Sequence, residues 1–181
     1  MDAIEAIHGR RSIRDYQARP LERALIEALI WDAAQAPPPA MSFTHRCAFA
    51  VVEGAERLAL LGDDAKRYAR KHQPGGSAWL DDPAFKVFWN APALILVCAA
   101  KDQPETDWDA VRAAQILLIS AHARGLGACW VGSPMSWLRS AEGAAAVAVP
   151  DGFAPVAPVL VGYSAVTPPP RQVEAPQIVW A

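Results

Sequence analysis

The sequence predicts a fold that combines α-helices with short buried β-strands, and residues 109–132 carry most of that prediction. From Asp109 to Arg124, apolar residues recur at three- and four-residue spacing around much of the cylinder, which is typical of a helix buried on nearly every side. Gly125 ends this helix and opens a glycine turn that lets backbone approach a flat or charged group. Residues 128–131 follow as a short apolar run that predicts a buried strand.

The composition indicates one globular domain with a partner surface. With 181 residues the chain is long enough for a substantial core, and we expect a single domain over residues 1–181. Hydrophobic residues make up 52% of the chain, which indicates an additional buried surface between subunits. A net charge of −2 predicts no general attraction to nucleic acid or membranes. The longest apolar run, 91–100, is too short to span a bilayer, and the N-terminus lacks the apolar core of a signal peptide, so we expect a cytoplasmic protein.

The cysteines and histidines predict neither a disulfide nor a metal site. The three cysteines, Cys47, Cys98 and Cys129, are far apart in apolar surroundings, as reduced core thiols are. The four histidines show no spacing typical of metal ligands.

Shorter patterns predict the remaining elements. Helices are expected at 2–9 (with Ile4 and Ile7 facing inward), 21–35, 56–61 and 136–146, and strands at 48–52, 93–99 and 155–162. The basic residues of 66–72 are interpreted as a solvated helix face, and 73–82 as a loop that could lie over a pocket. The proline-rich tail, 168–181, ends in apolar residues that need something to pack on, such as a neighbouring subunit.

A cluster of cations follows the first predicted helix. Arg10, Arg11 and Arg14 surround the hydroxyl of Ser12. Guanidinium groups offer paired donors in a fixed fork, so the cluster suits an anionic group such as phosphate. The alternative is an ordinary solvated face.

The landmarks, in this order, resemble those of the FMN-dependent nitroreductase family in its short form. The matching segments are Arg10-Arg11-Ser12-Ile13-Arg14, Ala36-Pro37, Asn90-Ala91-Pro92, Asp109 with Ala113-Ala114-Gln115 leading to Gly125-Leu126-Gly127-Ala128-Cys129-Trp130, and Pro155 with Leu160-Val161-Gly162-Tyr163. No single segment is specific, and the evidence is their order over nearly the whole chain.

The resemblance implies an α+β fold, with helices around a mixed sheet, and an intertwined homodimer with FMN at each subunit interface. The tail, 165–181, is expected to pack on the partner subunit. The cofactor-binding residues that it implies are Arg10, Arg11 and Ser12 at the phosphate and ribityl chain, Arg14 near the flavin, Pro38 and Pro39 through their carbonyls, Trp130, Val131 and Gly132 at the ring, and Arg171 at the phosphate. For Arg171 the alternative is an exposed tail charge.

One stretch departs from the family pattern. After Ala-Pro the family commonly has Ser and then an Asn-x-Gln-Pro-Trp element at the edge of the flavin pocket. Residues 38–49 here read Pro-Pro-Ala-Met-Ser-Phe-Thr-His-Arg-Cys-Ala-Phe, without that asparagine and without Gln-Pro-Trp. The prolines offer carbonyls but no N–H. The departure therefore predicts altered cofactor affinity and substrate choice.

The resemblance implies an oxidoreductase in which NAD(P)H gives a hydride to flavin N5 and an oxidant such as a nitro-aromatic or quinone then takes it. The flavin carries the chemistry, so no catalytic side chain is expected. One alternative is a flavin-consuming or desaturating relative in which O₂ is the oxidant. Another is a degenerate, non-catalytic dimer that binds a ligand or serves as a scaffold.

Overall fold

The computed structural model describes residues 1–37, 46–72, 80, 82–102 and 106–181, and the structural statements below concern these residues. The sheet has four strands, β1 (Cys47–Glu53), β2 (Ala93–Ala100), β3 (Gly127–Trp130) and β4 (Phe153–Gly162). They lie in the order β1-β2-β4-β3, and each neighbouring pair is antiparallel. A parallel bridge joins Ser12 to Ala128 at the β3 edge, which adds a parallel element to the sheet. The predicted α+β class is confirmed.

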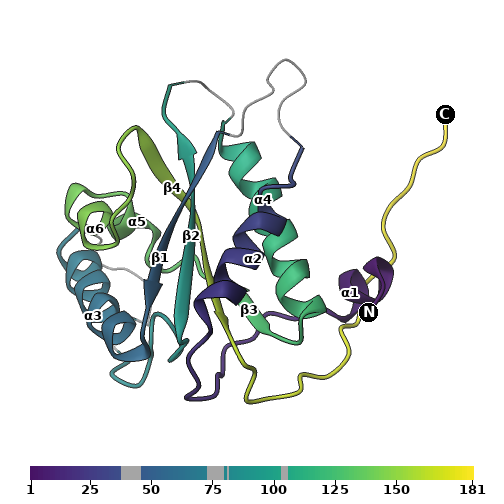
Figure 1. Cartoon of the computed structure of the whole chain (residues 1–181), viewed down its shortest axis with the longest axis horizontal. Coiled ribbons are helices and arrows are strands. Elements are labelled where there is room, and N and C mark those ends of the chain that lie inside the picture. The colour runs from purple at the N-terminus through teal and green to yellow at the C-terminus, as the bar shows by residue number, and fades with distance from the viewer. Residues whose placement is uncertain (38–45, 73–79, 81, 103–105) are drawn as a thin grey trace.

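Helices cover both faces of the sheet (Figure 1). The helices α2 (Arg23–Ala33) and α4 (Thr106–Ala123) pack on one face, and α3 (Ala55–His72), α5 (Met135–Leu138) and α6 (Ala141–Ala146) lie on the other. Each face has its own apolar cluster, one built with Leu29 and Leu117 and the other with Leu58 and Trp137. Strand β2 is buried from its first residue to Ala99, because both clusters cover it. This explains its nearly continuous apolar sequence.

Helix α1 (Ala3–Gly9) packs against α4 with the opposite side from the one predicted. Ile4 and Ile7 are 62% and 51% exposed, whereas Ala6 is 1% exposed. A capping box between Asp2 and Glu5 starts this helix. The buried residue of this helix is the small Ala6, and at its end a Cβ added to Gly9 would lie 2.5 Å from the Nε2 atom of His122 on α4. The prediction that both isoleucines face inward is therefore wrong for the single chain.

Three other predicted helices differ in extent or burial. The helix predicted at 56–61 continues to His72, because buried residues at helical spacing recur through Ala65 and Ala69. The helix predicted at 136–146 is two helices, since Ser140 accepts a hydrogen bond from the Gly143 N–H and starts α6 as its N-cap. Helix α4 is not buried on nearly every side, because Trp108 is 60% and Val111 41% exposed. No helix in the described ranges is both long and apolar enough to cross a membrane.

The tail beyond Ala165 has no secondary structure and leaves the body of the molecule (Figure 1). Its end exposes Ile178, Val179 and Trp180 by 61%, 82% and 90%. Apolar side chains at such exposure gain nothing from the hydrophobic effect in the single chain.

Candidate functional site

The segment that carries the cation cluster is fixed to the sheet at its start. The Ile13 N–H donates to the Ala128 carbonyl at 3.0 Å. The Ile13 side chain is buried against Gly127, where an added Cβ would lie 2.8 Å from the Ile13 Cβ. Because successive side chains of an extended segment point to opposite sides, Ser12 and Arg14 face outward and are exposed.

The far end of the same segment has a second anchor. The buried Tyr16 hydroxyl donates to the Ile13 carbonyl at 2.6 Å, and burial raises the pKa of Tyr16 so that it remains a donor. The Gln17 N–H donates to the Tyr163 carbonyl at 2.9 Å, and the Arg19 guanidinium lies 3.8 Å from the centre of the Tyr163 ring. Residues 12–16 are thus held at both ends, which fixes where the outward side chains lie.

Three of the predicted site residues converge on the end of β3, around Cys129. Burial raises the pKa of the Cys129 thiol, while the charges of Arg14 and Arg10 and the hydrogen-bonding groups of Ser12 and Arg14 act in the opposite direction. The thiol is completely buried, as expected of a core cysteine. The sequence could not predict that Cys129 lies beneath this cluster. That position depends on the pairing of two segments that are more than a hundred residues apart.

Arg11 turns away from this cluster and closes the end of α1. Its Nη1 donates to the carbonyls of His8 and Arg10, at 2.7 and 2.9 Å, and its Nε donates to the Pro169 carbonyl at 3.3 Å. The base of the tail is therefore attached next to the cation cluster. Arg171 follows two residues later and is exposed, so its predicted place at a phosphate depends on the course of the tail.

The backbone after β3 offers one open position. Trp130 is 36% exposed at the end of the edge strand, and the Val131 N–H is taken by the Pro158 carbonyl at 3.0 Å. An added Cβ on Gly132 would meet nothing within 4 Å. Of these three predicted residues, Gly132 is the one with free space beside its backbone. Pro38 and Pro39, the remaining predicted site residues, lie outside the described residues, as does most of the departed stretch.

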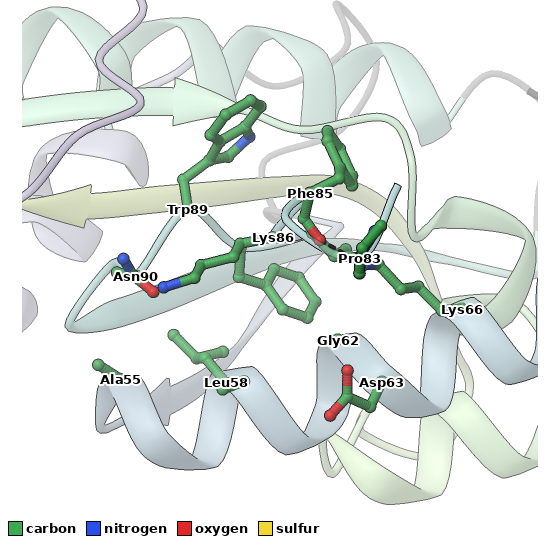
Figure 2. Close-up of a pocket in the computed structure, with 13 residues that line it drawn as sticks. Ala55, Leu58, Gly62, Asp63, Lys66, Pro83, Phe85, Lys86, Trp89 and Asn90 are labelled. Carbon is green, nitrogen blue, oxygen red and sulfur yellow. Dashed lines mark hydrogen bonds between the residues drawn. The ribbon is translucent and has the colours of Figure 1, made fainter. Parts of the chain in front are cut away.

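A separate cavity of about 240 Å³ lies between α3 and residues 83–90, and none of its lining residues belongs to the cation cluster (Figure 2). Lys66 is only 8% exposed, and its Nζ donates to the carbonyls of Asp82, at 3.3 Å, and Phe85. Arg70 donates to the Leu80 carbonyl at 2.6 Å. The interpretation of the basic run as a solvated face is therefore wrong for Lys66, whose aliphatic stem is buried while its head pairs with backbone. Over the part of the chain that is described, no group of three His, Cys, Asp or Glu could hold a metal ion.

Comparison with known proteins identifies the class. The model of the nitroreductase family matches residues 7–163, and the chain belongs to that family. It is 32% identical over 182 residues to a Methanothermobacter thermautotrophicus protein named "Putative NADH dehydrogenase/NAD(P)H nitroreductase", with 97% of this chain and 84% of the relative covered. The resemblance predicted from the ordered motifs is confirmed.

Solved structures with the same fold include two nitroreductases with bound FMN. The Bacteroides fragilis protein has a TM-score of 0.87 at 21% identity, and the Desulfitobacterium hafniense protein has one of 0.84 at 22% identity. In both cases the match covers 100% of this chain and 99% of the other. At these identities the likeness shows the fold.

Proposed function

We propose that this protein is an FMN-dependent oxidoreductase that transfers a hydride from NAD(P)H to a nitro-aromatic, quinone or similar oxidant. The observation that carries the proposal is the doubly anchored segment 12–16, which holds Ser12 and Arg14 outward at the end of β3 with Arg10 beside them. The bound FMN of two structural neighbours and the nicotinamide in the relative's name support it.

The side chains at this site include the kinds of hydrogen-bond donor that bind a flavin phosphate. Arg10 supplies a guanidinium and Ser12 a hydroxyl, both suited to phosphate oxygens, and Arg171 could add a second guanidinium from the tail. Arg14 lies on the same outward side and would favour negative charge on a reduced ring. When bound, FMN supplies the two-electron chemistry. The residues of this chain bind and orient it, and Gly132 leaves room for a ring edge to approach the backbone.

We propose in addition that the active form is a homodimer in which residues 165–181 pack on the partner subunit. The tail makes no element in its own chain and ends in three exposed apolar residues. Obligate interfaces commonly bury more than about 2,000 Å² and are as apolar as the core of a domain. Light scattering should give twice the chain mass of 19.5 kDa at micromolar concentration, and a stable monomer would contradict the proposal.

The function is tested by titrating apo-protein with FMN and following the quench of flavin fluorescence. The loaded protein is then mixed anaerobically with NADH or NADPH, and bleaching of the flavin is followed by stopped flow. Bleaching that is reversed by a nitro-aromatic or quinone is the expected result. Reoxidation by O₂ alone, with no turnover of added oxidants, would favour the flavin-consuming or desaturating alternative. Absence of any quench at high micromolar FMN would favour the non-catalytic scaffold.

A further inference from the structure

The cavity between α3 and residues 83–90 is lined by a buried cation, Lys66 (Figure 2). A lysine ammonium group has three N–H donors, and the carbonyls of Asp82 and Phe85 accept from two of them. Among the described residues, the third donor has no partner, and no carboxylate oxygen lies within 4.0 Å of the Lys66 Nζ atom. A buried charge without a counter-ion is costly, so Lys66 favours an anion in this cavity.

A second lysine, Lys86, lines the same cavity from the segment that faces α3. In Figure 2 its side chain extends toward Asn90, which also lines the cavity. The turn that carries both residues is closed by a hydrogen bond of 3.1 Å from the Trp89 N–H to the Lys86 carbonyl. Trp89 and Asn90 have φ angles of 50° and 56°, a left-handed conformation that a bulky residue seldom adopts and that is concentrated at binding sites.

The rest of the cavity combines an apolar wall with one carboxylate. Leu58, Val87 and Phe88 line it and are no more than 3% exposed. Within the described part of the lining, Asp63 is the one acidic residue, and it is exposed. Two ammonium groups therefore face one carboxylate. An engineered apolar cavity of about 150 Å³ in another protein binds benzene. A cavity of about 240 Å³ thus has room for an aromatic ring that carries a short acidic chain.

We propose that this cavity is a binding site for a small aromatic carboxylate. The buried Lys66 is the contact of the carboxylate group, because it has a donor to spare and no counter-ion. The ring packs against Leu58 and Phe88, and the exposed Lys86 adds positive potential that Asp63 partly opposes. The lining contains no residue of the cation cluster, so the inference does not rest on the proposed function.

The first test locates the ligand, with phenylacetate added to the intact protein both as purified and saturated with FMN. Two-dimensional ¹H–¹⁵N NMR follows the backbone amides during the titration. We expect saturable shifts at Gly62 and Asn90, which line the cavity, in both forms of the protein. Gly132, which is not part of the lining, should not move. Absence of saturable shifts at Gly62 and Asn90, or shifts confined to Gly132 and the cation cluster, would overturn the inference.

The second test measures whether the cavity recognises the carboxylate. Phenylacetamide has nearly the same shape without the charge, and acetate has the charge without the ring. Calorimetry should give phenylacetate the highest affinity of the three. Lys66→Met keeps most of the stem and should reduce the affinity for phenylacetate by about tenfold or more, with little effect on phenylacetamide. Equal affinities of the wild type for phenylacetate and phenylacetamide would overturn the inference.

Two exposed residues test the same electrostatics without disturbing the core. Lys86→Met should weaken the binding of phenylacetate by about two- to fivefold, and Asp63→Asn should strengthen it by a similar factor. Lys71→Met is the matched control, because it removes the same charge from α3 outside the cavity. Shifts of the same sign in Lys86→Met and Asp63→Asn, or a loss in Lys71→Met as large as in Lys86→Met, would contradict the site. These opposite shifts decide the matter even where circular dichroism shows that Lys66→Met does not fold.

Discussion

At the scale of single residues, Ile13 and Gly127 together decide which side chains of the cation cluster face outward. Ile13 is buried only because Gly127 leaves it room, and Ser12 and Arg14 are exposed as a result. The residue types of the cluster could be predicted from the sequence. Which guanidinium faces which side could not, because Arg11 is turned aside by three carbonyl groups, one of them in the distant tail.

Gly127→Ala should destabilise the protein. The new methyl group would lie 2.8 Å from the Ile13 side chain, and overpacking of this kind costs about 1–3 kcal/mol. Urea unfolding should show the loss as a lower midpoint. Gly132→Ala is the matched control, because its Cβ meets nothing within 4 Å, and a loss as large in Gly132→Ala would contradict the explanation.

Arg10→Ala should weaken FMN binding while leaving riboflavin binding almost unchanged. A charge-assisted hydrogen bond to phosphate contributes about 1.5–3 kcal/mol to binding. Riboflavin has no phosphate, so its complex never contains this bond and loses nothing in the variant. Fluorescence titration of both ligands against both proteins measures the difference. A wild type with no measurable preference for FMN would remove the phosphate role from this cluster.

At the scale of elements, helix and strand periodicity predicted the order of the elements well, because the buried strands and long helices repeat their pattern several times. Periodicity failed to predict which side chains are buried where contact with another element decides their burial. A seven-residue helix such as α1 has too few residues to define its own buried side, and contact with α4 fixes it instead. Likewise, a lysine on an amphipathic helix is expected in solvent, and only the return of residues 82–85 across α3 buries Lys66.

Lys66→Ala should lower the free energy of unfolding by about 1.5–3 kcal/mol, the range for lost hydrogen bonds of a charged group. The variant also loses the packing of the aliphatic stem. Lys66→Met keeps most of that stem and should recover part of the loss. Lys71→Ala, on the exposed side of the same helix, should change stability by less than about 0.5 kcal/mol. Equal losses of stability at the two lysines would mean that the hydrogen bonds from Lys66 to residues 82–85 contribute nothing to the free energy of unfolding.

At the scale of the whole molecule, the departed stretch 38–49 should reduce cofactor retention. A buried flavin group left without its partner costs about 1–3 kcal/mol, and about 1.4 kcal/mol is a tenfold change in dissociation constant. We therefore expect the protein to purify pale and to lose FMN on dialysis. Replacing Met41 or Ser42 by Asn should raise retention if the new amide reaches the ring. A fully yellow protein that survives dialysis would contradict the weakening.

The hydrogen bond from Arg11 to the Pro169 carbonyl joins the base of the tail to the segment beside the proposed phosphate subsite. If the tail closes the dimer, Arg11 ties the assembled tail to the backbone of the segment that binds the cofactor, and the two equilibria cannot be independent. Dilution towards monomers should release flavin, and added flavin should draw monomers together. The dissociation constant for FMN should accordingly be larger at nanomolar than at micromolar protein, and Arg11→Ala should remove much of that dependence on concentration.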